Sequence, residues 1–278
     1  PHTQLCAYGK CVGLPKNNVG NSEAGHINIG AGRVFKQDAV LISEAITDGR
    51  FKKNTAINQT IKHVNDNKSS LHLMGMISDH ESPHSSLEHL YALVDLAFSK
   101  NVKEIYLHLF TDGRDSPQFH AIPILEEVMK NVYGKAKLAT IIGRFYAMDR
   151  GKNWSRTEKA YNCLTIGSDQ QFSDYKEAII HEYNKKITDE YIEPNVIGDN
   201  KRDGKESRIK DNDGILFFNL RSDRARQLTK CFVQSQFNKM NRYAFRRKKI
   251  IKNLMFCAFT DFGPDLDSIM TAFPSPDL

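Results

Sequence analysis

The sequence predicts an α/β protein in which a mostly parallel sheet is covered by helices on both faces. Short apolar runs rich in β-forming residues recur along the chain, and segments with helical spacing of apolar residues lie between them. Strands that alternate with helices of this length indicate βαβ units, which build parallel sheets buried on both faces. The 278 residues are 40% apolar with 17 glycines, a composition typical of a folded globular protein. A chain of this length has room for one or two domains and for a core that needs no disulfide or metal.

The expected elements follow in order along the chain. Apolar runs predict buried strands at 71 to 77, 104 to 110, 137 to 142, 214 to 220 and 254 to 259. Two amphipathic helices are predicted between the first three strands, because apolar residues repeat there at i, i+3, i+4 and i+7. Their apolar positions are Leu87, Leu90, Tyr91, Val94 and Phe98 in one helix and Ile122, Leu125, Val128, Met129 and Val132 in the other. The stretch from 184 to 213 is polar and turn-rich without a clear period, so we expect a surface excursion or a small hairpin there.

Polar residues follow four of these strands. They are Ser78, Asp79 and His84 after the first, Asp112, Arg114 and Asp115 after the second, Arg144 after the third, and Arg221, Asp223 and Arg224 after the strand at 214 to 220. Ligands of open α/β sheets bind outside the carboxyl ends of the strands. Arginine pairs bidentately with phosphate and carboxylate oxygens, so four arginines and a histidine predict a site for a small, multiply charged anion such as a phosphorylated carboxylate. The alternative is that each arginine is an ordinary ion-pair partner at the surface or at a strand end.

The positive charge of the chain is concentrated in one segment. The formal net charge is +6, yet the stretch from Lys239 to Leu254 contains seven Lys and Arg and no acid, so the rest of the chain sums to −1. We interpret the segment Lys239 to Lys252 as a solvated connector. The alternative is a site for nucleic acid or for an acidic partner.

Cysteine usage and hydropathy favour a reducing compartment. The five cysteines are odd in number, have unrelated spacings and include no C-x-x-C pair, so we predict reduced thiols that pack in the core rather than a disulfide or zinc framework. No run of 18 apolar residues and no signal-peptide pattern is present, and we therefore expect a cytoplasmic protein that does not contact a membrane. The chain opens at Pro1 without a Met, so we expect it to be a piece of a longer protein.

Five sequence motifs resemble those of a known enzyme family. Residues 20 to 33, GNSEAGHINIGAGR, resemble the nucleophile motif of the cofactor-independent (2,3-bisphosphoglycerate-independent) phosphoglycerate mutases of the alkaline phosphatase superfamily. HLMGMISD (72 to 79), LFTDGRDSP (109 to 117), IIGRFYAMDRGKNWSRTEKAY (141 to 161) and ILFFNLRSDRARQ (215 to 227) follow in the family order. The resemblance implies an isomerase that interconverts 3-phosphoglycerate and 2-phosphoglycerate through a phosphoserine intermediate, in glycolysis and gluconeogenesis. The alternatives are a phosphomonoesterase of the same superfamily and a non-catalytic fragment that binds an anion or nucleic acid.

Ser22 is the candidate catalytic residue of the first motif. Asn21 or Ser22 can cap a short helix that begins near Glu23, where a phosphate on the serine oxygen would meet unpaired backbone N–H groups and the positive helix end. A hydroxyl is a weak nucleophile unless a base or a metal activates it. The resemblance implies that Ser22 is also a ligand to one of two divalent ions, Mn²⁺ or Mg²⁺, and that 2,3-bisphosphoglycerate is not a cofactor.

The other motifs imply a set of substrate-binding residues. By resemblance these are His84, Arg114, Asp115, Arg144, Arg150, Arg221 and Arg224. The arginines would hold phosphate and carboxylate, while Asp115 and His84 would hydrogen-bond or exchange protons with the glycerate hydroxyls. The family has a Gly-Gly-Val-His-Ser-His run where this chain has residues 80 to 86, so His80 competes with His84 for this role. Asp149 and Trp154 are expected to be structural, pairing with an arginine and packing, respectively.

The resemblance also implies how the chain is divided. Residues 1 to 36 would be a remnant of an alkaline-phosphatase-like α/β domain, 37 to 270 the transferase domain that grips the substrate, and 271 to 278 a return connector. Family members are about twice this long, and their remaining metal ligands match nothing in this chain. We therefore expect the isolated chain to bind phosphoglycerate weakly at most and to be inactive. The expected partner is a small-molecule substrate, with no nucleic acid, and the chain is expected to be monomeric.

Overall fold

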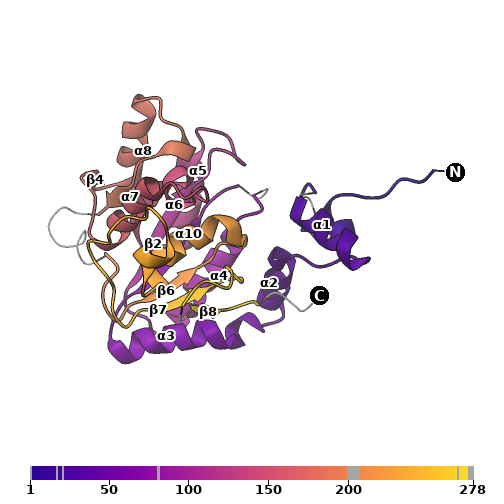
Figure 1. Ribbon diagram of the computed structural model, residues 1–278, viewed down its shortest axis with the longest axis horizontal. Helices are drawn as coiled ribbons and strands as arrows, with labels where there is room; N and C mark the ends of the chain where they lie inside the picture. The colour runs from indigo at the N-terminus through magenta and orange to yellow at the C-terminus, as the bar shows by residue number, and fades with distance from the viewer. Residues whose placement is uncertain are drawn as a thin grey trace.

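The computed structural model describes residues 2–16, 18–20, 22–79, 82–198, 207–267 and 269–274, with the backbone alone at residue 23. The strands are β1 (Leu71–Met76), β2 (Ile105–Thr111), β3 (Lys137–Gly143), β4 (Gln171–Phe172), β5 (Asn195–Ile197), β6 (Gly214–Phe217), β7 (Met255–Ala258) and β8 (Ile269–Thr271). They form one sheet in the order β4-β5-β3-β2-β1-β6-β7-β8 (Figure 1). Neighbouring strands are parallel except for β3 and β5. The predicted fold class, an α/β protein with a mostly parallel sheet, is confirmed.

The five strands predicted from apolar runs are β1, β2, β3, β6 and β7, which occupy neighbouring places in the sheet. Successive side chains of a strand point to opposite faces. In β1, Leu71 and Leu73 accordingly enter one hydrophobic core, and Met74 and Met76 enter the other. A strand between two cores is mostly apolar, and this explains why a nearly continuous apolar run identified it. The buried His72 of β1 is the exception, and its ring nitrogens are hydrogen-bonded to His108 and Asp213.

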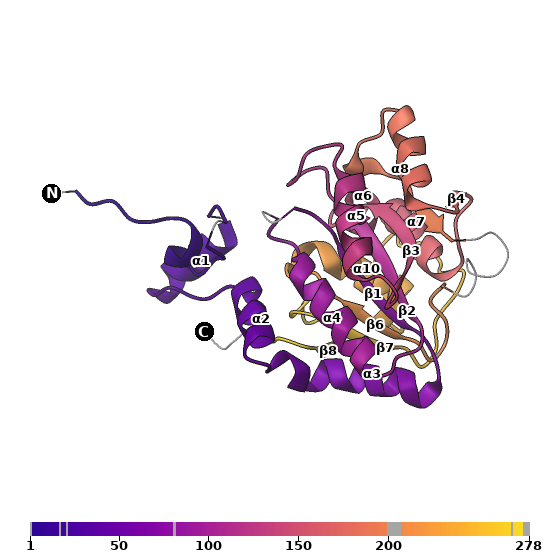
Figure 2. The ribbon, with the colours of Figure 1, turned by 180° about the vertical axis from the view of Figure 1, so that it is seen from behind.

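Helices cover both faces of the sheet (Figures 1 and 2). The helices of the chain are α1 (Ser22–Ala31), which lies apart from the sheet, and α2 (Asp38–Thr47), α3 (Thr55–Asn67), α4 (Leu87–Ser99), α5 (Ala121–Asn131), α6 (Arg144–Ala147), α7 (Trp154–Thr165), α8 (Tyr175–Asn184), α10 (Ser222–Val233) and α11 (Phe237–Met240). Short 3-10 turns are η1 (Gly9–Val12), η2 (Phe51–Lys53) and η3 (Asp189–Tyr191). Buried side chains of α2, α3, α4, α5 and α8 share one core, and those of α6, α7, α10 and α11 share the other. The two helices predicted from apolar spacing are confirmed as α4 and α5.

The N-terminal segment that carries α1 lies apart from the sheet in both views, whereas α2 packs against α4 (Figures 1 and 2). The domain boundary predicted after residue 36 falls just before α2. The predicted connector from 271 to 278 begins at the last residue of β8, and Phe273 still packs against the core. These domain boundaries remain predictions.

The expectation of a surface excursion from 184 to 213 is wrong for part of that stretch. Residues 195 to 197 form β5, which is buried and pairs with both β3 and β4. A strand of three residues is too short to show a period, and the polar residues around it hide the signal. Residues 199 to 206 lie outside the described part of the chain.

The prediction that all cysteines are reduced packing thiols is also wrong for one pair. Cys6 and Cys11 form a disulfide whose Cα atoms are 5.8 Å apart, a separation that disulfides require and that η1 creates by folding the chain back. The other cysteines, Cys163, Cys231 and Cys257, are free and buried as predicted. Among the described residues, no helix is both long and apolar enough to cross a membrane.

The basic segment Lys239 to Lys252 links α11 to the start of β7 and is only partly solvated. The Lys249 ammonium donates to the carbonyls of Thr165 (3.0 Å) and Ile209 (2.9 Å). The Arg247 guanidinium donates to the carbonyl of Cys231 at 2.9 Å. Two of its cations therefore tie this segment to α7, α10 and the chain before β6.

Candidate substrate-binding site

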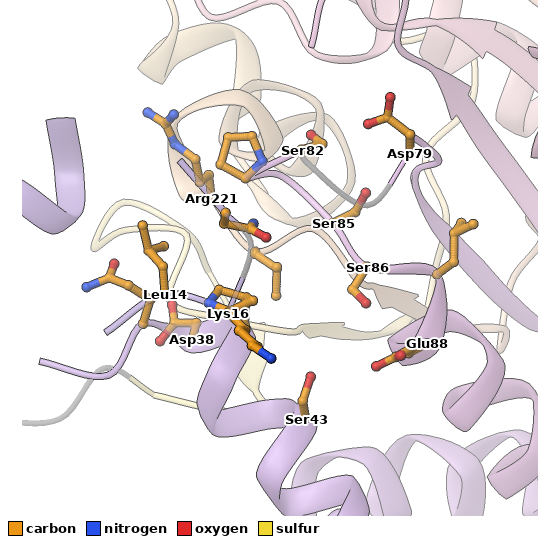
Figure 3. Close-up of a pocket in the computed structure, with 17 residues that line it drawn as sticks. Leu14, Lys16, Asp38, Ser43, Asp79, Ser82, Ser85, Ser86, Glu88 and Arg221 are labelled. Carbon is orange, nitrogen blue, oxygen red and sulfur yellow. The ribbon is translucent and has the colours of Figure 1, made fainter. Parts of the chain in front are cut away.

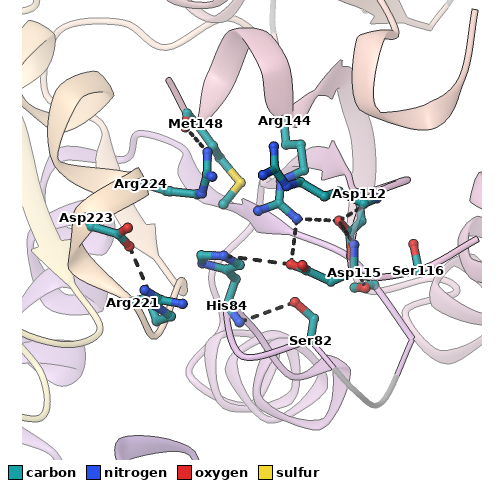
Figure 4. A network of polar contacts seen from close by, with 12 residues as sticks. Ser82, His84, Asp112, Asp115, Ser116, Arg144, Met148, Arg221, Asp223 and Arg224 are labelled. Atoms are coloured by element: carbon teal, nitrogen blue, oxygen red, sulfur yellow. Dashed lines mark hydrogen bonds and ion pairs between the residues drawn. The ribbon is translucent and has the colours of Figure 1, made fainter. Parts of the chain in front are cut away.

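The carboxyl ends of four neighbouring parallel strands bring their loops to one edge of the sheet. The loops follow β1, β2, β3 and β6, which are adjacent in the order β3-β2-β1-β6. Figure 4 shows the polar network that these loops form, which we call the strand-end network. Its labelled residues are Ser82, His84, Asp112, Asp115, Ser116, Arg144, Met148, Arg221, Asp223 and Arg224.

Asp112 and Arg144 form the buried centre of the strand-end network. The Arg144 guanidinium is paired with Asp112 and lies 2.6 Å from Asp115 Oδ2. Asp112 Oδ1 also accepts from the backbone N–H groups of Arg114 (3.2 Å) and Asp115 (3.1 Å), and its Oδ2 accepts from the Ser78 hydroxyl. Burial disfavours the charge on Arg144, but the two carboxylates outweigh it and raise the pKa of the guanidinium above its usual value. One carboxylate thus orients both an arginine and the turn that follows β2.

His84 is buried beside this centre and is neutral at physiological pH. Its Nε2 lies 3.8 Å from Asp115 Oδ2, and its backbone carbonyl accepts from the N–H of Leu220 at 2.7 Å, which ties the loop to the end of β6. Burial first, and then the cations Arg144 and Arg221, lower the pKa of His84 to about 4. Its Nδ1 is buried and has no hydrogen-bond partner among the described atoms. A neutral imidazole with a vacant nitrogen can accept or donate one hydrogen bond to a ligand.

Three further arginines of the predicted set are more exposed. Arg150 pairs with Asp223 at 2.5 Å, and Arg114 lies 3.5 Å from Glu190. Arg224 donates to the carbonyl of Met148 at 3.5 Å but pairs with no carboxylate among the described residues. Burial, followed by repulsion from Arg144 and Arg150, lowers the pKa of Arg224 from its usual value. Arg224 is therefore a cation of the strand-end network that no ion pair with a described carboxylate occupies.

The structure brings most of the predicted binding residues together. His84, Asp115, Arg144, Arg221 and Arg224 belong to the strand-end network. Arg150 joins it through its ion pair with Asp223, and Arg114 joins it through the backbone N–H that donates to Asp112. His80 lies outside the described residues, so the competition between the two histidines is untested.

The sequence motifs assigned no role to Asp112 and Asp223, although both follow predicted strands. The pattern that points to them is the alternation of acids with arginines in DGRD and RSDR.

Asp149 and Trp154 have the structural roles expected of them. Asp149 pairs with Arg156 at 3.1 Å, and the Trp154 ring packs edge-on against Phe237.

A cavity of about 380 Å³ lies next to the strand-end network (Figure 3). It opens between the N-terminal segment with α2 and the loops after β1 and β6, and its volume suits a small molecule. Arg221 belongs both to its lining and to the strand-end network. The other labelled residues of the lining are Leu14, Lys16, Asp38, Ser43, Asp79, Ser82, Ser85, Ser86 and Glu88.

Ser22 is exposed and is the first residue of α1, the helix that lies apart from the sheet (Figure 1). Its hydroxyl lies 3.2 Å from His26 Nδ1, but the same nitrogen is 2.6 Å from the Ser22 carbonyl oxygen. A carbonyl only accepts, so Nδ1 must carry the proton and cannot take one from the hydroxyl. Here His26 is therefore not a base for Ser22.

The described residues do not fit a metal centre at Ser22. They contain no group of three or more His, Cys, Asp and Glu side chains arranged to hold an ion. A dinuclear centre that includes Ser22 would need ligands other than the described residues.

Comparisons with known proteins agree with this architecture. The family model described as BPG-independent PGAM N-terminus matches residues 42–263. The 2,3-bisphosphoglycerate-independent phosphoglycerate mutase of Moorella thermoacetica is 46% identical over 277 residues, which are 99% of this chain and 52% of that protein. The enzyme of the same name from Legionella pneumophila (strain Lens) is 44% identical over 279 residues, 99% of this chain and 51% of that one.

A solved structure leads to the same result. The crystal structure of Leishmania mexicana phosphoglycerate mutase at low cobalt concentration superposes with a TM-score of 0.84 and 30% identity, over 98% of this chain and 50% of that one. The chain thus spans about half the length of the proteins it matches. With its matching family model and its mostly parallel sheet, the chain belongs to the family of the 2,3-bisphosphoglycerate-independent phosphoglycerate mutases, of which it carries the N-terminal part.

Proposed function

We propose that this chain is the substrate-binding part of a phosphoglycerate mutase that interconverts 3-phosphoglycerate and 2-phosphoglycerate, and that the strand-end network binds the substrate. The observation that carries the proposal is the convergence of arginines and a neutral histidine from four loops on one edge of the sheet. A phosphorylated carboxylate has two anionic groups, and guanidinium groups are suited to both.

Several unsatisfied groups support a ligand of this kind. Arg224 lacks a carboxylate partner among the described residues, and the buried Arg144 Nε and His84 Nδ1 lack hydrogen-bond partners there. A buried polar atom without a partner carries a free-energy cost that a bound ligand removes. In the proposed complex, Arg224 pairs with an anionic group, and His84 with Asp115 faces the glycerate hydroxyls.

Ser22 is proposed as the group that accepts the phosphate. Its hydroxyl needs activation, and the divalent ions implied by the resemblance, Mn²⁺ or Mg²⁺, would supply it by lowering the pKa of a bound hydroxyl. Because the described residues hold no such centre, we expect the 278-residue chain to show no turnover in an enolase-coupled assay with either metal. Metal-dependent turnover by this chain would contradict that expectation.

Calorimetric titration with 3-phosphoglycerate tests the binding proposal. Arg224→Gln should weaken binding by about 10- to 100-fold, the range for loss of one charge-assisted hydrogen bond. Arg50→Gln is the matched control, because Arg50 is exposed and pairs with Asp48 in the turn after α2. Ser22→Ala should bind as the wild type does, since Ser22 is not part of the strand-end network and its helix α1 lies apart from the sheet. Equal affinity of the Arg224→Gln and Arg50→Gln variants would refute the proposed site.

The compartment and the remaining partners are proposals as well. We propose a cytoplasmic, monomeric protein that binds no nucleic acid and, as the family name states, needs no 2,3-bisphosphoglycerate. Light scattering tests the monomeric state, for which the expected mass is 31.7 kDa. Titration with RNA at several salt concentrations tests the basic segment, because phosphate contacts make affinity fall steeply with salt.

A further inference from the structure

The turn before α1 is closed by the disulfide between Cys6 and Cys11. The two residues are 5 positions apart, and both are exposed. The 3-10 turn η1 begins at Gly9, inside the ring that the disulfide closes. Backbone hydrogen bonds extend this turn: Leu14 N–H donates to the Gly9 carbonyl (3.0 Å), and Gly9 N–H donates to that of Asn18 (2.9 Å).

The closed turn touches the segment that leads into α2. Gly13 has φ of 79°, and a Cβ there would lie 1.8 Å from the Phe35 carbonyl oxygen, so the two backbones are in direct contact. The N–H of Gln37 donates to the Gly13 carbonyl at 2.8 Å. Residues 35 to 37 are therefore held against the end of η1.

The same turn also holds α1. Asn28 lies on α1, and its Nδ2 donates to the Val12 carbonyl at 3.0 Å. Its Oδ1 accepts from the N–H of Phe35 at 2.7 Å. One side chain thus links α1, the disulfide-closed turn and the segment before α2.

We propose that Cys6 and Cys11 are a reversible thiol–disulfide pair, and that its oxidation state sets how firmly α1 is held to residues 35 to 37. The oxidant is a small disulfide of the glutathione type. One cysteine thiolate attacks it to give a mixed disulfide and releases one thiolate. The second cysteine thiolate then displaces the other, so that two electrons pass to the oxidant and two protons from the cysteines go to the released thiols.

The remaining cysteines cannot compete in this exchange. Cys163, Cys231 and Cys257 are fully buried, and burial raises the pKa of Cys163 and of Cys257 to about 12. The thiolate is the reacting species, so these side chains stay inert while the protein is folded. Exposed disulfides are, in contrast, the ones that small thiols reduce. The redox chemistry is therefore confined to the turn before α1.

Thiol trapping of the whole 278-residue chain tests the first half of the proposal. The chain is equilibrated in buffers of reduced and oxidised glutathione, alkylated, and mapped by mass spectrometry. We expect Cys6 and Cys11 to become labelled together as the buffer becomes more reducing, with the other three labelled only after unfolding. A pair that stays reduced in oxidised glutathione, or stays oxidised in excess reduced glutathione, would overturn it.

Hydrogen exchange tests the coupling to α1. Reduction should speed exchange of the Leu14 and Gln37 amides by up to about 40-fold, the factor that the chain-entropy model assigns to closing a loop of this length. The double variant Cys6→Ser and Cys11→Ser should show the fast rates in every buffer, whereas Thr3→Ser, a change in the same exposed segment, should keep the response. Exchange rates that are the same in both redox states would overturn the coupling. Neither readout involves phosphoglycerate, so the proposal stands apart from the proposed function.

Discussion

Replacing Asp112 with Asn tests whether one buried carboxylate organises the strand-end network. The amide oxygen can still accept from the backbone N–H groups of Arg114 and Asp115, and the amide nitrogen can donate to the Ser78 hydroxyl. What disappears is the negative charge beside Arg144, whose side chain is 2% exposed. The substitution thus removes charge with little change in shape.

The stability effect follows from this burial. Removing one partner of a buried ion pair costs about 3–5 kcal/mol, because it leaves a charge uncompensated. Here Asp115 remains 2.6 Å from Arg144, with 30% of its side chain exposed. We therefore expect a loss of about 2–4 kcal/mol, below the full cost of an unpaired buried charge. Each kcal/mol lowers the melting temperature of a chain of this size by roughly 2–4 °C.

The binding effect separates two roles of Asp112. If it acts by position, the variant loosens Arg144 and the turn after β2, and affinity for 3-phosphoglycerate falls by about tenfold or more, equal to a loss of at least about 1.4 kcal/mol. If it only balances charge, removing a negative group raises the local positive potential, and affinity for the anion increases. We expect the fall.

Urea unfolding and calorimetric titration measure the two effects. Asp95→Asn is the control, because Asp95 forms an exposed pair with Lys135 at 2.6 Å, which should contribute less than about 1 kcal/mol. An Asp112→Asn variant as stable as this control, with unchanged or tighter binding, would refute the positioning role.

Two further predictions concern pH and packing. The pKa of His84 is about 4 in the folded chain against the usual 6.5, so the unfolded chain binds a proton first as pH falls and the free energy of unfolding decreases between these values. His84→Gln should therefore flatten this dependence by up to about 1.4 kcal/mol per pH unit, and an unaltered slope in urea unfolding from pH 4 to pH 7 would contradict the assignment. Gly75→Ala should destabilise the chain by about 1–3 kcal/mol, because the added Cβ would lie 2.7 Å from the Phe218 ring inside the core. Thermal unfolding of Gly75→Ala and of the exposed control Ser99→Ala would measure this loss of stability. Equal melting temperatures of the two variants would contradict the close packing of Gly75 against the Phe218 ring.

Much of the candidate site could be placed from the sequence. Arg144 and His84 follow segments that were predicted as strands, and parallel strands end at one edge of the sheet. The sequence could not show that two carboxylates bind Arg144, since those contacts join different loops. The sequence also could not show where Ser22 lies relative to the strand-end network. In the structure its helix, α1, lies apart from the sheet.

The sequence by itself determined the central strands and the α4 and α5 helices, because burial on both faces requires continuous apolar runs and helices require apolar spacing. It also indicated the family, through five motifs in the family order. Tertiary structure alone decided the rest. β5 forms because its backbone groups find partners in β3 and β4, strands that precede it by tens of residues, and its own three residues carry no pattern. Cys6 and Cys11 join because η1 folds the chain back, and Asp112 gains its role only where the Arg144 guanidinium reaches it. The strand β5 and the Asp112–Arg144 pair depend on partners that are distant in sequence, and the disulfide depends on a local turn. The residue types alone specify neither the distant partners nor the turn.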